Sequence, residues 1–196
     1  MTRTAPKTVN LIGLPVAATN YHQAIEWIEA AALSGDRAYA VEAANTHVAA
    51  LARHDQSFGE VMEKFDLVCP DGMPLVWLLN QKLDEAEKLT DRVYGPTLML
   101  KTIAASEQQQ KLKHFFFGGK QGTLAELTKR FTEDYPEAEL AGSYSPPFGT
   151  WPEDEFERVC EKIKESGANL VWVGLGCPKQ EQWIAEHKDH LPSAVY

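Results

Sequence analysis

The feature that most constrains the fold is a pair of short segments made only of apolar residues. Residues 115–117 (Phe-Phe-Phe) and 170–173 (Leu-Val-Trp-Val) contain no polar side chain, and glycine follows each of them. A strand with one face in solvent alternates apolar and polar residues, so continuous apolar runs are typical of strands covered on both faces. The sequence therefore predicts a mostly parallel sheet packed between two layers of helices.

Helical patterns alternate with short strand patterns along the rest of the chain. Asn20 and Gln23 have the spacing of a capping box, Thr123 and Glu126 repeat it, and Pro152 predicts another helix start. This alternation predicts an α/β fold of the Rossmann-like type, as a single domain over residues 1–196, with a small N-terminal hairpin over residues 10–18. The strands are expected at residues 39–43, 66–69, 114–117, 139–142 and 170–173, with a sixth beginning at 194–196.

Length, charge and cysteine content exclude several functional classes. The formal net charge of −9 argues against nucleic acid as a non-specific partner. No apolar stretch approaches the ~20 residues of a membrane-spanning helix, and the chain does not begin like a secretory signal, so a cytoplasmic protein is expected. Three widely spaced cysteines, Cys69, Cys160 and Cys177, indicate neither a disulfide framework nor a zinc site. Neither a cofactor nor a bound metal is expected.

Polar residues follow the first two predicted parallel strands directly. Asn45 and Thr46 come after one strand, and Asp71 lies on a tight Pro-Asp-Gly turn after the next. Carboxyl ends of parallel strands meet at one edge of a sheet, where Asn45 can bind a ligand oxygen and Asp71 can act as a general base. Two alternatives stay open, because Asn45 or Thr46 can simply cap a helix and Asp71 can be a turn residue. Asp66, at the start of its strand, is expected to be structural.

Two glycine-containing turns follow the apolar strands. In the first, Gly118 allows the backbone to approach a phosphate and Lys120 adds a positive charge. This turn is neither a Walker A loop nor a GxGxxG fingerprint, so an ordinary strand-to-helix turn remains an alternative. The Rossmann-type oxidoreductases are disfavoured for the same reason.

The second turn carries more information, because small, cationic and amide residues occur together in it. Gly174 and Gly176 permit close approach of the backbone, while Lys179 and Gln180 can reach the oxygens of a ligand. Arg92, just before a predicted helix, can pair with a diphosphate through its planar guanidinium group, or it can be a surface cation. These residues are expected on the same rim as Asp71.

Taken together and in this order, the segments resemble the WecG/TagA/CpsF glycosyltransferases, known as glycosyltransferase family 26. The resemblance covers nearly the whole chain, and its last run is the most specific. The matching runs are Asn45-Thr46, Pro70-Asp71-Gly72, Arg92-Val93-Tyr94-Gly95, Phe117-Gly118-Gly119-Lys120 and the nine residues from Val173 to Glu181.

The resemblance implies an inverting, metal-independent transfer of N-acetylmannosamine, or its uronate or a related hexose, from a UDP-sugar to an undecaprenyl-diphosphate-linked sugar. Such steps build teichoic acid, capsule or other surface polysaccharides. Asp71 matches the proposed catalytic base, Asn45 a residue near that base, and Arg92 and Gln180 polar residues lining the site. Contact of Lys120 and the Gly118 and Gly119 amides with phosphate is an expectation from the residues alone.

Two departures from the family pattern affect these expectations. Ala43 stands where many members have threonine, so a hydroxyl contact is absent or supplied by Thr46. Members of the family also continue beyond the position of Tyr196 with a basic segment, which contacts the inner leaflet of the membrane. We therefore expect a catalytic core without that segment, peripheral on the cytoplasmic face of the membrane. The alternative is a non-catalytic nucleotide-sugar-binding or scaffold protein.

Overall fold

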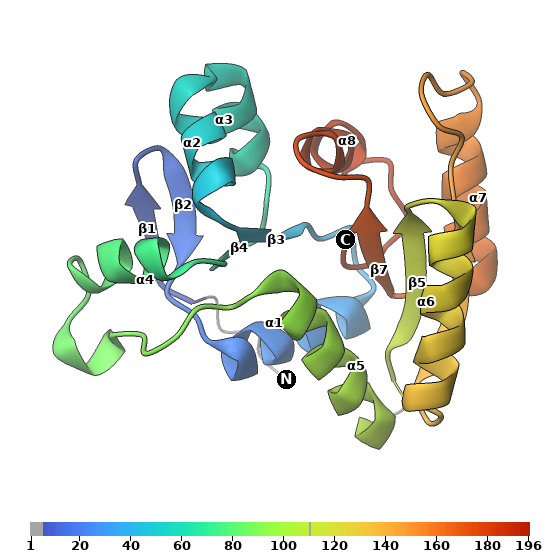
Figure 1. Ribbon diagram of the computed structural model, residues 1–196, viewed down its shortest axis with the longest axis horizontal. Helices are drawn as coiled ribbons and strands as arrows, with labels where there is room; N and C mark the ends of the chain where they lie inside the picture. The colour runs from blue at the N-terminus through green and yellow to red at the C-terminus, as the bar shows by residue number, and fades with distance from the viewer. Residues whose placement is uncertain (1–5, 110) are drawn as a thin grey trace.

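The computed structural model describes residues 6–109 and 111–196 and begins with the predicted hairpin (Figure 1). Strand β1 (Thr8–Leu11) pairs antiparallel with β2 (Leu14–Ala17). Ile12 and Gly13 turn the chain between them with φ angles of 51° and 98°, and the Gly13 N–H donates to Asn10 Oδ1. Residues 1–5, part of the segment judged to lack a secretory signal, lie outside the described residues.

Five parallel strands form two neighbouring sheets. Strand β3 (Val41–Ala44) pairs with β4 (Leu67–Pro70). In the other sheet, β5 (Lys113–Gly118) lies between β6 (Glu139–Tyr144) and β7 (Leu170–Gly174). All five predicted parallel strands are present, and each of their ends lies within two residues of the predicted position.

The last three residues join the two sheets. The stretch 194–196 lies between β7 and β3, and Val195 forms parallel bridges to both sides. The N–H of Tyr39 donates to the carbonyl of Ala194 at 2.9 Å, and that of Val171 donates to the carbonyl of Val195 at 2.7 Å. Figure 1 shows the C-terminus in this central position. The sixth strand, predicted to begin at residues 194–196, is therefore present as a short β-bridge between the two sheets.

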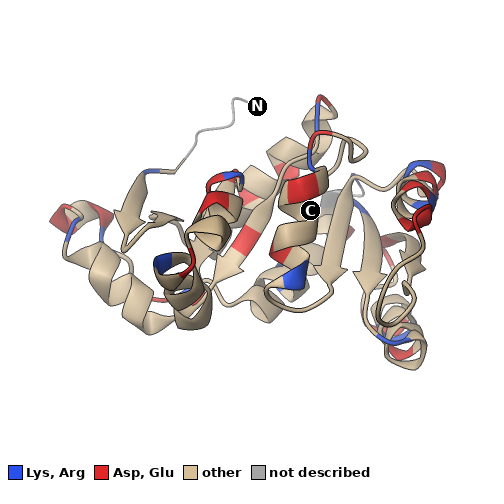
Figure 2. Cartoon of the chain, turned by 90° about the horizontal axis from the view of Figure 1, so that it is seen from above, with Lys and Arg blue, Asp and Glu red and all other residues tan. Residues whose placement is uncertain are grey.

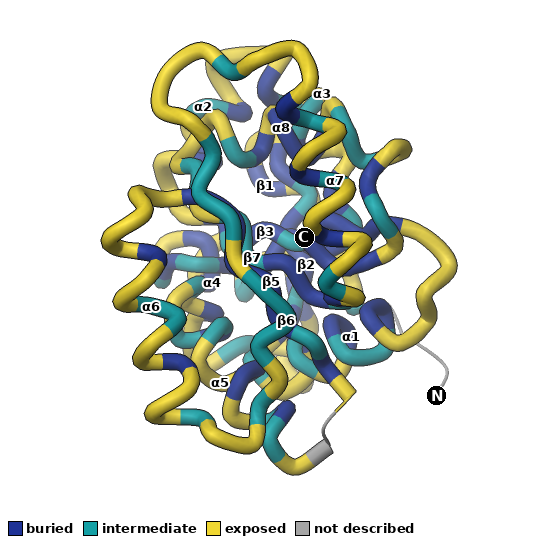
Figure 3. Tube along the Cα trace, turned by 90° about the vertical axis from the view of Figure 1, so that its right-hand side faces the viewer, coloured by how far each residue is buried: buried dark blue, intermediate teal, exposed yellow. Residues whose placement is uncertain are grey.

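Helices cover both faces of the sheets, which explains the continuous apolar strands. On one face, Phe116 packs with Leu124 and Phe131 of helix α6 (Gln121–Asp134). On the other face, the ring centroid of Phe117 lies 4.9 Å from that of Trp183 in helix α8 (Lys179–His187), with the two rings tilted. Figure 3 shows the buried residues gathered along the strands. The helices are α1 (Tyr21–Ser34), α2 (Thr46–His54), α3 (Gln56–Glu63), α4 (Met73–Asn80), α5 (Gly95–Gln109), α6 (Gln121–Asp134), α7 (Glu155–Ser166) and α8 (Lys179–His187), with the short 3₁₀ helix η1 (Glu85–Glu87).

Of the three helix starts predicted from the sequence, one is present as predicted and two differ. The capping box of Asn20 and Gln23 is present at the start of α1. Helix α6 begins at Gln121, so the prediction that Thr123 caps it is wrong; positive φ angles at Gly118 and Gly119 turn the chain directly into the helix. Helix α7 begins three residues after Pro152, because Pro152 accepts a hydrogen bond from the Glu155 N–H in a turn that precedes the helix.

Charged residues lie mainly on the helices and loops around the sheets (Figure 2). Within residues 6–109 and 111–196, no helix combines the length and the apolar character needed to cross a bilayer.

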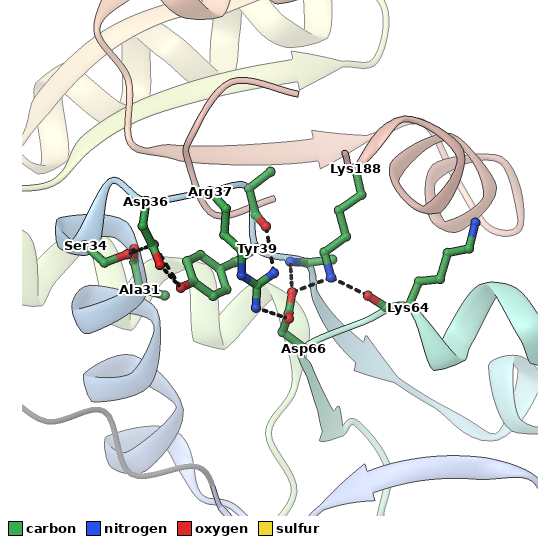
Figure 4. A network of polar contacts seen from close by, with 10 residues as sticks. Ala31, Ser34, Asp36, Arg37, Tyr39, Lys64, Asp66 and Lys188 are labelled. Atoms are coloured by element: carbon green, nitrogen blue, oxygen red, sulfur yellow. Dashed lines mark hydrogen bonds and ion pairs between the residues drawn. The ribbon is translucent and has the colours of Figure 1, made fainter. Parts of the chain in front are cut away.

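Asp66 connects three segments at the amino end of β4 (Figure 4). Its Oδ1 pairs with Arg37 Nη2 at 2.7 Å, and its Oδ2 pairs with Lys188 Nζ at 2.7 Å and accepts from the Ala40 N–H. Burial opposes ionisation of this carboxyl, but the hydrogen bonds from Arg37 and Lys188 outweigh it, so the pKa of Asp66 is lowered. The structural role expected of Asp66 is confirmed, since it binds the start of β3 to the chain after α8.

We expect Asp66→Ala to lower the free energy of unfolding by about 2–4 kcal/mol, because two cations lose their common partner. Urea denaturation at pH 7 measures this loss. A carboxyl whose pKa is lowered by folding stabilises the protein above its unfolded pKa and ceases to do so as pH falls through the folded value. The difference from the wild type should therefore shrink in acid. Glu126→Ala, which breaks the exposed pair with Arg130, is the control and should change little.

Candidate active site

A cavity of about 600 Å³ lies between β3 and β7. Residues 41–43 of β3 and 170–174 of β7 form its walls, and Val195 and Tyr196 contribute at the joint between the sheets. The cavity reaches the carboxyl ends of these strands, where ligands bind in open α/β sheets.

Asp71 is half-buried on the wall of this cavity. Its N–H donates to the Ala44 carbonyl at 2.8 Å, which fixes it at the end of β4, and its Oδ2 accepts from the Gly95 N–H at 3.3 Å. Burial raises the pKa of the Asp71 carboxyl, while the Gly95 hydrogen bond and the charge of Arg92 oppose the rise. The structure thus brings Arg92 near Asp71, and it gives Asp71 the raised pKa that suits a proton acceptor.

Asn45 performs the capping function that the sequence left open. Its Oδ1 accepts from the N–H groups of His47 at 2.9 Å and Val48 at 3.2 Å, and the residue also lines the cavity. The cap orients the side chain and leaves the Nδ2 group, which has no hydrogen-bond partner among the described residues, to donate to a ligand. Thr46 is the first residue of α2, is exposed, and does not line the cavity.

The two glycine turns touch each other. Gly118 has a φ of 118°, and a Cβ placed on it would lie 2.4 Å from the Gly174 carbonyl oxygen, so only glycine fits. The Gly119 N–H donates to that same oxygen at 3.0 Å. The Gly119 amide is therefore engaged within the protein, whereas helix α6, which follows Lys120, begins without a side-chain cap.

Gln180 holds the second turn in place. Its Oε1 accepts from the Gly176 N–H at 3.0 Å, and its Nε2 donates to Glu181 Oε1 at 3.2 Å. Gln180 lines the cavity, but Gly176 does not. The Gln180 side chain therefore stabilises the turn, and one hydrogen of its Nε2 group remains available to donate to a ligand.

A second hollow of about 480 Å³ adjoins the cavity. Lys120 and Lys179 line it, and Lys179 Nζ lies 4.1 Å from the centre of the Trp151 ring. Gly119 and Gly174 border both spaces. The predicted cations Lys120 and Lys179 thus lie together on the rim, but in the second hollow rather than beside Asp71.

Sequence reasoning missed two buried carboxyls, Glu42 and Glu181, on the cavity wall. Glu42 is 8% exposed and has no hydrogen-bond partner among the described residues; burial, with the charges of Glu181 and Asp71, raises its pKa to about 8. Glu181 is fully buried, and burial raises its pKa. Its Oε2 has no hydrogen-bond partner within residues 6–109 and 111–196. The sequence signal that could have identified Glu42 was its position as the one glutamate inside the otherwise apolar strand β3.

Two further titratable side chains line the cavity: Tyr196, whose pKa is raised by burial, and the thiol of Cys177. Burial and the neighbouring Glu181 raise the pKa of Cys177 to about 12, which keeps the thiol neutral. Within the part of the chain that the structure describes, no group of three or more His, Cys, Asp or Glu side chains is arranged to hold a metal ion.

Comparison with known protein families identifies the family of this chain. The sequence model of the glycosyl transferase WecG/TagA/CpsF family matches residues 9–196. The chain belongs to this family. The resemblance inferred from the five sequence runs is thereby confirmed, and the WecG/TagA/CpsF match includes every residue placed around the two hollows.

Two curated relatives within the WecG/TagA/CpsF family have the same name, N-acetylglucosaminyldiphosphoundecaprenol N-acetyl-beta-D-mannosaminyltransferase. The protein of Bacillus spizizenii is 29% identical over 87% of this chain and 63% of its own length. The protein of Bacillus subtilis is 22% identical over 96% of this chain and 70% of its own length. The chain thus spans about two thirds of the length of these relatives.

Glu42 should make stability depend on pH. Its pKa rises from 4.5 to about 8 on folding, so the folded state keeps a proton that the unfolded state loses. The free energy of unfolding should fall as pH rises through this window, by up to ~1.4 kcal/mol per pH unit. Glu42→Gln should remove most of this dependence, as measured by urea denaturation between pH 5 and 8. A wild-type profile in the variant would assign the dependence to other groups.

Proposed function

We propose that this chain carries the donor-binding and catalytic core of a glycosyltransferase that moves N-acetylmannosamine from UDP to a sugar on undecaprenyl diphosphate. The family membership and the names of the two relatives support the sugar and the acceptor. UDP as the carrier, inversion at the anomeric carbon and a role in teichoic acid or exopolysaccharide synthesis belong to the proposal.

The observation that carries the proposal is the position of Asp71. A half-buried carboxylate with a raised pKa faces a cavity at the carboxyl ends of parallel strands, and Gly95 holds it through a backbone hydrogen bond. In an inverting transfer, the acceptor hydroxyl attacks the anomeric carbon opposite to the leaving diphosphate. Asp71 would take the hydroxyl proton as the new bond forms, which contributes typically 10²–10⁴-fold to such rates.

The second hollow suits the leaving group. Lys120 and Lys179 would neutralise the charge that develops on the diphosphate, and the uncapped N-terminus of α6 adds favourable dipole. Arg92 lines neither space, and its guanidinium lies 4.7 Å from the centre of the Tyr94 ring, so its contact with the diphosphate rests on the sequence prediction alone. Asn45 and Gln180, which line the cavity, would donate to sugar oxygens through their amide groups.

The location of the reaction follows from the acceptor. A polyprenyl-linked sugar stays at the membrane, so we propose that the protein works in peripheral contact with the inner leaflet. The alternative function, binding of nucleotide sugars without transfer, differs in one measurable respect, because Asp71 would then not affect any turnover.

The first test measures UDP release from UDP-N-acetylmannosamine with a soluble lipid-diphosphate-N-acetylglucosamine analogue as acceptor. We expect Asp71→Asn to lower turnover by about 10²–10⁴-fold, because the amide cannot accept the proton, while the Kd for UDP stays within a few-fold. Asp134→Asn, at an exposed position of α6, is the matched control and should behave as the wild type. Equal turnover in Asp71→Asn and the wild type would remove Asp71 as the base.

A second test addresses the cations. Lys179→Gln and Lys120→Gln should each raise the Kd for UDP by about 5- to 50-fold in calorimetric titrations, and the effect should weaken as salt is added. Lys129→Gln, on the exposed surface of α6, provides a lysine of equal charge outside the hollow. UDP binding that is unchanged in both rim variants would place the diphosphate elsewhere.

A further inference from the structure

Helix α4 is apolar on all of its sides. Its sequence from Met73 to Asn80 contains no charged residue, and only Asn80 at its end is polar. A helix of this kind is normally buried all round. Here one side of α4 is buried, where Leu75 and Leu79 share a core cluster with Leu11 and Leu14 of the hairpin. Figure 1 shows α4 next to that hairpin, at the edge of the molecule.

The opposite side of α4 is exposed and uncharged. This outer face of α4 consists of Pro74, Trp77, Leu78 and Gln81, the residue that directly follows the helix. These positions are three or four residues apart, so their side chains adjoin one another. Trp77 is 60% exposed, whereas the other four tryptophans of the chain are buried or half-buried. A contiguous apolar face of this kind indicates a contact surface.

The outer face begins beside the proposed base. Only Gly72 separates Asp71 from α4, and Trp77 lies roughly 6 Å along the helix axis from its first residue. On the other side of Asp71, the Gly95 N–H holds its Oδ2, and the adjoining Tyr94 is 40% exposed. Exposed aromatic side chains therefore flank the turn that carries Asp71.

We propose that the outer face of α4 lies on the surface of a lipid bilayer and holds the opening of the site at the membrane. This inference rests on the acceptor of the proposed function, whose sugar must reach Asp71 while its polyprenyl chain stays among the lipid tails. It assigns the peripheral contact to a defined surface of the chain and to a defined force.

The residues of the outer face suit the boundary between lipid head groups and tails. Tryptophan is enriched there, because its ring is apolar while its N–H stays hydrated. Trp77 and Leu78 would enter the boundary, and Gln81 would remain among the head groups. With 8 residues, α4 is about 12 Å long and too short to cross a bilayer, so it would lie in the plane of the interface.

The contact would be apolar and not electrostatic. The chain has a formal net charge of −9, and the acidic residues Asp84, Glu85 and Glu87 follow α4 closely in and before η1. Anionic lipids attract basic surfaces and would repel this one. Burial of apolar surface requires no anionic lipid and is not screened by salt. Zwitterionic lipid should therefore be sufficient for binding.

Co-sedimentation with phosphatidylcholine vesicles tests the contact. We expect the wild type to bind and the double variant Trp77→Gln/Leu78→Gln to have a partition coefficient lower by about 10-fold, because less apolar surface enters the lipid. Sodium chloride at about 0.5 M should change wild-type binding by less than about two-fold. Leu33→Gln is the matched control, since Leu33 is 47% exposed near the far end of α1, and it should bind as the wild type does.

Fluorescence quenching identifies the tryptophan that enters the lipid. Phosphatidylcholine that carries bromine near the head-group end of its chains should quench part of the wild-type emission. Trp77→Phe keeps an apolar ring, so it should still bind vesicles while most of the quenching is lost. Equal quenching in Trp77→Phe and the wild type would place another tryptophan at the lipid and overturn the inference. Circular dichroism verifies that each variant is folded.

Turnover separates this inference from the proposed function. With a soluble short-chain acceptor analogue, the double variant should turn over within about two-fold of the wild type. With the polyprenyl-linked acceptor embedded in phosphatidylcholine vesicles, its turnover should fall by about 10-fold, in line with its weaker partition.

The outcomes distinguish the two proposals. Wild-type vesicle binding that is absent, equal in the double variant or abolished by salt overturns this inference, and turnover of the soluble acceptor would then leave the proposed function standing. A dimer that depends on Trp77 in sedimentation velocity, without vesicle binding, also overturns it and assigns the outer face to contact between copies of the chain. Vesicle binding through Trp77 without turnover on either acceptor supports this inference and removes the proposed function.

Discussion

The backbone hydrogen bonds of residues 194–196 are the constraint on which the arrangement depends. These three residues pair with the first part of β3 on one side and of β7 on the other, and they join two sheets that share no other strand pairing among the described elements. The cavity lies between β3 and β7 beside this joint, and side chains at the ends of β3, β4 and β7 form part of its wall.

The chemistry of the site follows from which groups this arrangement buries and which it leaves at the rim. Asp71 and Glu42 enter a region with few counter-charges, so burial raises the pKa of both carboxyls. Lys120 and Lys179 remain exposed at the neighbouring turns. Asp66, at the opposite end of the same strand as Asp71, has two cationic partners and a lowered pKa. One strand is thus flanked by a paired carboxylate with a lowered pKa at its amino end and by a carboxyl with a raised pKa at its carboxyl end.

Local patterns in the sequence were sufficient to predict the strands and the residues at their carboxyl ends. An apolar run is visible in a few neighbouring residues, and it indicates a strand covered on both faces. The glycine- and proline-containing turns that follow such strands place Asp71 and Gln180 after the strand ends. The cluster of Glu42 and Glu181 was not accessible in this way, because the two residues are far apart in the chain and meet only through packing of α8 on the sheet. The predicted helix start at Thr123 was wrong for a related reason, since the turn before α6 is set by the contact of Gly119 with Gly174. At Pro152 the helix starts later because the Glu155 N–H closes a separate turn.

The contact of Gly118 with Gly174 has a consequence for how such a site can change over time. Main-chain atoms of the two turns touch where any side chain at position 118 would collide. The spacing between the lysine-lined and carboxyl-lined spaces is therefore a property of the backbone and not of the residues that line them. Under the proposed function, substitutions on the cavity wall would alter the preferred sugar while the phosphate-binding side stays in place, so the two properties would diverge independently in homologous proteins.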